Sequence, residues 1–169
     1  AELAGCSTAP LKALCEKNLV TVHRERVHQN DHNLTGKAIE DDLALNPAQA
    51  DALAKITQVI HAQQTETIVL HGITGSGKTE VYIRAIQEVI RHRKQAIVLV
   101  PEISLTPQTK QRFRARFERV AVLHSHLTPS ERHWHWQQIA SGQIDVVVGA
   151  RSAVFAPLPQ LGMIVIDEE

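Results

Sequence analysis

One glycine-rich stretch decides the fold class of this chain: Gly72-Ile73-Thr74-Gly75-Ser76-Gly77-Lys78-Thr79. It satisfies the pattern G-x-x-x-x-G-K-[ST] in full, and this pattern indicates a phosphate-binding loop when a strand precedes it and a helix follows it. The apolar run Ile68-Val69-Leu70 predicts that strand, and the segment Glu80–Arg93 has the character of that helix. We therefore expect an α/β protein with a phosphate loop at its centre.

The residue types in the loop suit a nucleotide bound with Mg²⁺. Gly75 and Gly77 let the backbone curl so that successive N–H groups point at phosphate oxygens, and the helix N-terminus adds a favourable dipole. Lys78 carries charge for the β- and γ-phosphates, and Thr79 offers a hydroxyl to Mg²⁺. The candidate nucleotide contacts are Gly72, Thr74, Gly75, Ser76, Gly77, Lys78 and Thr79. The alternative, a glycine-rich turn that binds nothing, is disfavoured by the complete pattern.

A second motif lies about ninety residues downstream, where the apolar run Met163–Ile166 ends in Asp167-Glu168-Glu169. A buried parallel strand that ends in an acid places that acid beside the phosphates, at the carboxyl end of the sheet. We expect Asp167 to hold Mg²⁺ together with Thr79, and Glu168 to orient or deprotonate the attacking water. Lys78, Asp167 and Glu168 are thus the candidate catalytic residues.

A glutamine stands about two dozen residues before the loop, in Leu45-Asn46-Pro47-Ala48-Gln49. Asn46 and Pro47 suit the start of a helix. An amide side chain donates and accepts at once, which matches the edge of adenine. Gln49 is therefore a candidate for reading the base, although a glutamine in a first helical turn is more often a surface residue.

The rest of the chain alternates between apolar runs and helical stretches. Five short, β-branched runs do not alternate with polar residues, which predicts strands buried on both faces of a parallel sheet. These runs are Ile68–Leu70, Ala96–Val100, Val120–Leu123, Val146–Val148 and Met163–Ile166. The predicted helices are 47–63, 80–93, 105–117 and 129–140, and 151–161 is expected to be loop with a helical turn.

Three segments are expected along the chain. Residues 1–27 have the helix–turn–helix–strand order of a partial winged-helix-like domain, residues 28–45 form a polar linker, and residues 46–169 form the α/β lobe. The first residue is not Met and the last residues belong to a motif, so we expect a piece of a longer protein.

The amino-acid composition excludes several classes of protein function. The 169 residues carry 18 Lys plus Arg and 18 Asp plus Glu, so a polybasic arm or acidic tail is excluded as the main function. The 2 cysteines cannot build a disulfide scaffold or a four-cysteine zinc site. The sequence has neither a transmembrane run nor a signal peptide, so we expect a cytoplasmic protein without a membrane partner.

These motifs, in this order, resemble the first RecA-like lobe of superfamily 2 helicases. The phrases GITGSGKTEVY, LVPEISLTPQ, GARSAVFAPL and IVIDEE resemble in particular the bacterial replication-restart helicases. The resemblance covers residues 45–169 well and residues 1–27 loosely. It implies an ATP-dependent 3′ to 5′ DNA helicase that acts in replication restart and primosome assembly and lies in the bacterial nucleoid. The second lobe, the arginine finger and a zinc site would lie downstream, so this piece alone should not unwind DNA.

The resemblance also implies partners and further contacts. The partners would be forked or single-stranded DNA, primosome proteins and single-strand-binding protein. Thr106, Arg151 and Ser152 follow strand ends and have donors suited to DNA phosphates. The basic run between Lys110 and Arg119 is more simply read as a solvated helix face.

The sequence leaves two other functions open. One is the ATPase lobe of another superfamily 2 DNA translocase, which would share the phosphate loop but not the GARSAVFAPL stretch. The other is a winged-helix DNA-binding module in which the ATPase lobe is only a scaffold.

Overall fold

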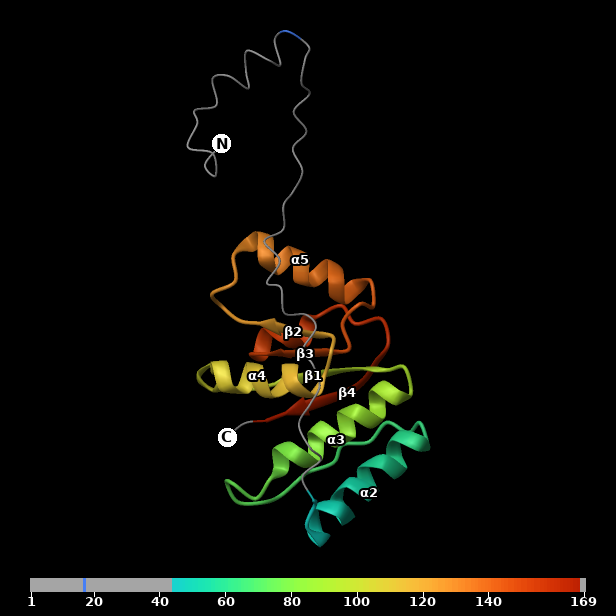
Figure 1. The fold of residues 1–169 in the computed structure, drawn as a ribbon. Helices are drawn as coiled ribbons and strands as arrows, with labels where there is room; N and C mark the ends of the chain where they lie inside the picture. Colours follow the sequence, from blue (N-terminus) through green and yellow to red (C-terminus); the bar gives the residue numbers. More distant parts are fainter. Residues whose placement is uncertain (1–16, 18–43, 168–169) are drawn as a thin grey trace.

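The computed structural model describes Lys17 and residues 44–167 (Figure 1). The predicted winged-helix-like segment 1–27, apart from Lys17, lies outside the described residues. So do nearly all of the linker 28–45 and the acidic residues Glu168 and Glu169. The described residues are therefore almost entirely those of the lobe expected from residue 46 onward.

A four-stranded parallel sheet forms the centre of the lobe. Its strands are β1 (Gln95–Leu99), β2 (Val120–Leu123), β3 (Val146–Gly149) and β4 (Leu161–Ile166), in the order β2-β3-β1-β4. Every neighbouring pair is parallel. Parallel neighbours need crossover connections, and these run through helices or helical turns. The predicted α/β class with a parallel sheet flanked by helices is confirmed.

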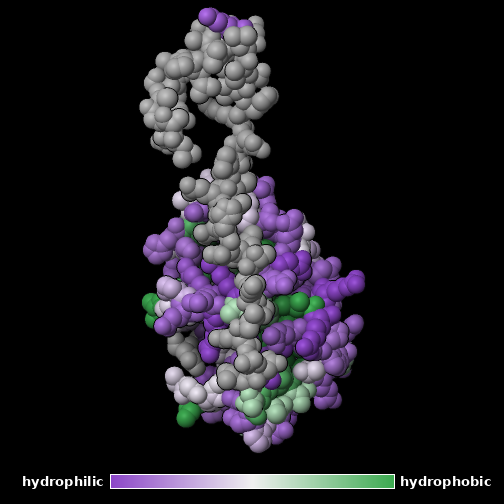
Figure 2. All heavy atoms as spheres, viewed as in Figure 1, coloured by the Kyte–Doolittle hydropathy of each residue, from purple (hydrophilic) through white to green (hydrophobic). Residues whose placement is uncertain are grey.

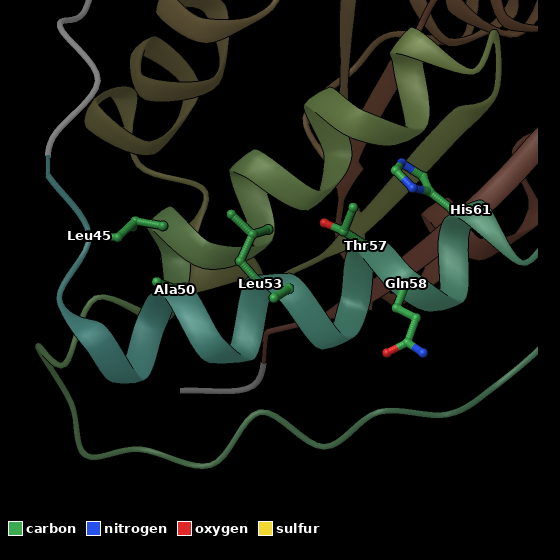
Figure 3. A pocket seen from close by; sticks show the side chains of 7 residues that line it. Leu45, Ala50, Leu53, Thr57, Gln58 and His61 are labelled. Atoms are coloured by element: carbon green, nitrogen blue, oxygen red, sulfur yellow. The ribbon is translucent and has the colours of Figure 1, made fainter.

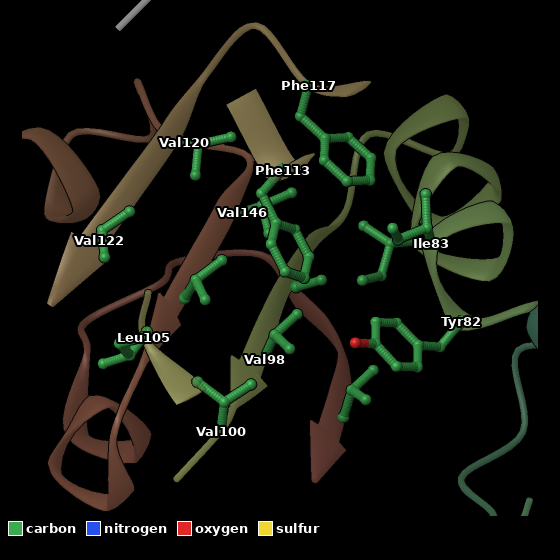
Figure 4. Close-up of a cluster of buried hydrophobic side chains, with 14 residues drawn as sticks. Tyr82, Ile83, Val98, Val100, Leu105, Phe113, Phe117, Val120, Val122 and Val146 are labelled. Carbon is green, nitrogen blue, oxygen red and sulfur yellow. The ribbon is translucent and has the colours of Figure 1, made fainter. Parts of the chain in front are cut away.

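The alternation of side chains along the strands separates two faces of the sheet. One face, with Ala96, Val98, Val120 and Val146 among its members, packs on helices α3 (Lys78–Arg91) and α4 (Pro107–Arg116). Figure 4 shows this cluster, in which Phe113 and Phe117 of the α4 region and Tyr82 and Ile83 of α3 point toward the strands. The centre of the sheet is therefore buried on this side, as the non-alternating sequence predicts.

The opposite face packs on α5 (Pro129–Ala140) and on the 3₁₀ turn η3 (Arg151–Phe155). Ile97, Val147 and Ile139 lie within this second cluster. The helix boundaries follow capping chemistry: Thr128 accepts from the backbone N–H of Glu131, and the Glu131 side chain accepts from the N–H of Thr128. The prediction of a helix over 129–140 is confirmed at both ends.

Helix α2 (Pro47–His61) forms an outer layer that packs against α3 rather than on the sheet (Figure 1). Ile56 contacts a small cluster with Val81 and Ala85 of α3. The two helices run parallel, because the amino end of α2 meets the amino end of α3 and their carboxyl ends also meet. This layer joins the predicted adenine-reading region to the helix that follows the phosphate loop.

The prediction of a strand over Ile68–Leu70 is wrong for this structure. The segment pairs with none of the described strands, and the exposed fractions are 44% for Ile68 and 84% for Val69. Only Leu70 packs inward, against the cluster between α2 and α3. A strand needs a neighbour for its backbone N–H and C=O groups, and these three apolar residues, which have none among the described strands, form part of a connecting segment.

The expectation that all strands are buried on both faces also fails at β4. Leu161, Ile164 and Ile166 are exposed, whereas Val165 is buried. The reason is missing cover on one face: no β4 residue belongs to the cluster that α5 and η3 form with β1, β2 and β3. Edge position alone does not explain the exposure, because β2 is also an edge strand and is buried. Two helix starts differ by two residues from expectation, because Gly77 and Thr106 are the N-cap residues of α3 and α4.

The surface is mainly hydrophilic on the face seen in Figure 2, where apolar side chains appear as separate areas. None of the helices in the described part of the chain has the length and apolar character needed to cross a membrane.

Candidate nucleotide-binding site

The phosphate loop closes directly onto the first turn of α3. Gly75 and Gly77 have φ angles of 78° and 82°, a left-handed conformation that glycine adopts without strain. Gly77 is the N-cap of α3 and supplies no side-chain cap, so the first amides of the helix are not capped by it. A side chain at Gly75 would meet nothing within 4 Å, which leaves open space over the loop. This open, positive helix end fits a phosphate group.

Lys78 lies folded back over the loop. Its Nζ donates hydrogen bonds to the backbone oxygens of Gly72, at 2.8 Å, and of Ile73, at 3.2 Å. The ammonium group is therefore held by the same loop whose amides form the anion cradle. Phosphate oxygens are strong acceptors for such a charge, and the contact of Lys78 with them stays a prediction.

Tyr82 lies beside the two residues predicted to hold Mg²⁺. Its hydroxyl donates to Oδ2 of Asp167 at 2.7 Å, and the Thr79 side chain is near enough to influence its pKa. Burial, and next the hydrogen bond to Asp167, raise the pKa of Tyr82 above its ordinary value. The phenol therefore stays protonated and remains a donor at neutral pH. The Asp167 carboxylate and the Thr79 hydroxyl are oxygen ligands of the type that Mg²⁺ prefers.

Gln49 contacts the phosphate loop directly. Its Oε1 accepts from the N–H of Asn46 at 2.9 Å, and its Nε2 donates to the backbone oxygen of Ser76 at 2.8 Å. Asn46 in return accepts from the N–H of Gln49, which completes a capping box. The amide thus ties the start of α2 to the loop. The prediction that it reads adenine stays a prediction, because here both ends of the amide are occupied by the protein.

The residues predicted to contact DNA lie at the carboxyl ends of β1 and β3, at the same sheet edge as Asp167. Thr106, Arg151 and Ser152 are all exposed. Thr106 caps α4 by accepting from the N–H of Thr109 at 3.2 Å. The 3₁₀ turn η2 (Glu102–Ser104) precedes it, and the Glu102 carboxylate accepts from the N–H of Ser125. The structure therefore gathers these loops at one edge, and their role in DNA contact stays a prediction.

The basic run on α4 is not uniformly solvated, contrary to expectation. The side chain of Arg116 is 4% exposed and pairs with Glu80, which also accepts from Arg84 at 2.9 Å. Glu80 directly follows Thr79, so this ion pair fixes the first turn of α3 against α4. A buried cation needs such a carboxylate, because an unpaired charge in the interior is costly.

Sequence reasoning missed Tyr82 and Arg116 as supports of the site. Tyr82 stands three residues after Thr79, a spacing that puts both on one helix face, and this signal points to it. Arg116 pairs across 36 positions with Glu80, and no local pattern reveals such a contact. Glu168, the predicted water-orienting residue, lies outside the described residues.

A phosphate loop at a helix start, facing an acid at the end of a parallel strand, defines a nucleotide-binding lobe of the P-loop class. Residues 46–169 match the DEAD/DEAH box helicase family, so the chain belongs to that family. The family implies binding of ATP with Mg²⁺.

Particular relatives carry the name replication restart protein PriA. The chain is 43% identical over 164 residues to the protein of that name from Bacillus subtilis, covering 96% of this chain and 20% of the relative. It is 43% identical over 168 residues to the one from Synechocystis, covering 97% and 19%. It is 47% identical over 131 residues to the one from Haemophilus influenzae, covering 77% and 18%. The chain thus spans about a fifth of the length of these relatives.

Proposed function

We propose that this chain is the ATP-binding lobe of an ATP-dependent 3′ to 5′ DNA helicase that acts in replication restart and primosome assembly. The observation that carries the proposal is the arrangement of Lys78, Thr79 and Asp167 around one phosphate loop, with Tyr82 hydrogen-bonded to Asp167. The likeness to PriA proteins over nearly the whole chain supports the biological role.

The residues of the lobe divide the chemistry of phosphoryl transfer between them. Lys78 and the loop amides bind phosphate oxygens and neutralise their charge. Thr79 and Asp167 would hold Mg²⁺, which when bound withdraws charge from the phosphates. Glu168 orients the attacking water by accepting its hydrogen bond. Tyr82 keeps the Asp167 carboxylate aimed at the loop, and Gln49 fixes the loop to α2 and reads the base edge.

The DNA partner is proposed to bind along the loops at the carboxyl ends of β1 and β3. Arg151 and Ser152 open η3, and Thr106 opens α4, so their donors face one sheet edge where phosphates of a single strand can lie. Forked or single-stranded DNA, primosome proteins and single-strand-binding protein are the proposed partners of the whole protein, with a zinc site in its downstream part and a nucleoid location in the cytoplasm.

Calorimetric titration of the 169-residue chain with Mg²⁺-ATP tests the proposal. We expect one molecule of ATP to bind and Lys78→Ala to abolish the binding. Lys55→Ala removes an equivalent charge from the exposed side of α2 and serves as the matched control, which should bind as the wild type does. A folded wild-type chain that binds no nucleotide would contradict the proposed role of the loop.

A second titration separates the helicase lobe from the winged-helix alternative. Fluorescence anisotropy with single-stranded DNA at several salt concentrations should show that Arg151→Ala lowers the slope of log K against log[salt] by about 0.7. Arg132→Ala on α5 should leave the slope unchanged. A winged-helix module with a scaffold lobe would keep DNA affinity unchanged in Arg151→Ala and in Lys78→Ala alike.

A further inference from the structure

A cluster of two histidines and one glutamate lies at the carboxyl ends of α2 and α3, away from the phosphate loop. His61 ends α2, and Glu88 and His92 stand one helical turn apart at the end of α3. Figure 3 shows His61 at the end of α2 with its ring on the side of α3. Their ligand atoms all lie within 4.8 Å of one another, and this is the one such group of three or more found among the described residues.

Nitrogen atoms of both histidines lie near one carboxylate oxygen. Nε2 of His61 lies 2.8 Å from Oε1 of Glu88, and Nδ1 of His92 lies 3.7 Å from the same oxygen. Without a cation, Nδ1 of His92 is hydrogen-bonded to the backbone oxygen of Glu88 at 2.9 Å. The two imidazole rings are 5.0 Å apart between centroids. Ligand atoms around a tetrahedral zinc ion with bonds of about 2.0 Å are separated by about 3.3 Å. Shifts of at most about 1.5 Å in the separations, with the release of the His92 bond to the Glu88 backbone oxygen, bring these ligand atoms to coordinating positions.

The second carboxylate oxygen of Glu88 is already held in place. Oε2 accepts from Nη1 of Arg91 at 2.9 Å, which leaves Oε1 turned toward the two histidines. Hydrogen bonds from His61 and next from Arg91 lower the pKa of Glu88, so its side chain is an ionised ligand at neutral pH. Hydrogen bonds to a ligating carboxylate are a usual feature of metal sites, because they orient the ligand.

We propose that His61, Glu88 and His92 form a binding site for a zinc-type divalent cation. Two imidazole nitrogens and one carboxylate oxygen are ligands of the kind that zinc takes, with water in the remaining position. The cation would fasten the carboxyl end of α2 to α3, as Gln49 fastens its amino end to the loop. The site is separate from the Mg²⁺ site at the phosphate loop and from the zinc site expected downstream in the whole protein.

Calorimetric titration with zinc chloride tests the proposal in the full chain with Cys6→Ser and Cys15→Ser, so that thiolates do not compete. We expect one equivalent to bind and the melting temperature to rise with zinc concentration. His61→Gln keeps a hydrogen-bond donor for Glu88 but removes a zinc ligand of this type. Replacing a residue that only hydrogen-bonds to a metal ligand typically weakens metal binding by about 10- to 100-fold. His61→Gln should weaken zinc binding by more than this, because it removes a ligand.

His92→Gln should weaken the binding in the same way, and His133→Gln, which alters an exposed histidine on α5, should leave it unchanged. Circular dichroism establishes that each variant is folded. The proposal is overturned if the folded parent chain binds no zinc at micromolar concentrations. It is also overturned if binding persists at full affinity in both His61→Gln and His92→Gln, which would mean that the cluster is an ordinary surface ion pair.

Discussion

The hydroxyl of Tyr82 donates a hydrogen bond to Asp167 across a distance of 2.7 Å, joining the helix that follows the phosphate loop to the end of strand β4. These residues are 85 positions apart in the sequence. The contact helps to set the distance between the two halves of the proposed Mg²⁺ site, because Thr79 stands one turn earlier on the same helix as Tyr82. Tyr82 is thus a positioning residue for Asp167.

Tyr82→Phe removes this hydrogen bond and keeps the ring in the core. A hydrogen bond to a charged group contributes about 1.5–3 kcal/mol, so the affinity for Mg²⁺-ATP should fall by about tenfold or more. The affinity for ATP measured in EDTA should hardly change, since Asp167 acts through the cation. Calorimetry with and without Mg²⁺ makes the comparison. Equal weakening in both conditions would show that Tyr82 supports the loop only as a packing residue.

The same tyrosine should make the lobe sensitive to alkali. Its pKa is raised in the folded state, whereas the unfolded chain ionises at about pH 10. Above that pH the unfolded state binds fewer protons than the folded state, so the free energy of unfolding falls as pH rises. Below about pH 9 the contribution of the protonated Tyr82 to the free energy of unfolding is fully present. Urea unfolding of the wild type and of Tyr82→Phe between about pH 8 and 11 should show a steeper alkaline loss in the wild type.

Gln49→Ala separates two roles of this side chain. Loss of the capping box and of the bond to the Ser76 carbonyl should lower the free energy of unfolding by about 1–2 kcal/mol. If Gln49 also reads adenine, ATP affinity should fall more than GTP affinity, so that the preference for ATP shrinks. Nucleotide titrations of wild type and variant give the ratio. If the affinities for ATP and GTP fell equally, Gln49 would support the phosphate loop without reading the base.

Gly77→Ala should be more damaging than Gly142→Ala, although both glycines have positive φ angles, of 82° and 73°. An added Cβ at Gly77 would lie 2.3 Å from Nε2 of Gln49, whereas at Gly142 the nearest atom is 3.9 Å away. Backbone strain alone costs about 1–2 kcal/mol, and this is the expected effect at Gly142. At Gly77 the added Cβ also displaces the Gln49 amide and breaks its bond to the Ser76 carbonyl, so Gly77→Ala should also weaken Mg²⁺-ATP binding. Thermal unfolding and calorimetry of both variants check this difference.

The parts of the fold that local chemistry determines could be predicted well. The pattern Thr128-Pro129 with Glu131 locates the start of α5, and the β-branched run Val120–Leu123 forms β2 at the expected residues. The strand over Ile68–Leu70 was mispredicted because strand formation depends on a neighbour, which a local pattern does not show. The loop was predicted from its glycines and Lys78, and its support by Tyr82 depends on a contact with a distant strand.

The buried ion pair between Arg116 and Glu80 also could not be predicted from a local sequence pattern. A run of basic residues looks the same in sequence whether its members face water or the interior, and only the packing of α4 against α3 separates them. The site residues that belong to contiguous motifs were therefore accessible from the sequence. The residues that hold those motifs together were not, since their partners come from other elements.

The outer position of α2 has a consequence for how the lobe opens. Its apolar contacts form a small cluster of their own, apart from the two clusters that enclose the sheet. Segments with few buried contacts exchange their amide hydrogens through partial opening, at lower free energy than global unfolding. Amides of α2 should therefore exchange earlier than those of β1 and β3. Because Gln49 begins this helix, each such opening frees the phosphate loop from its tether while the sheet stays folded.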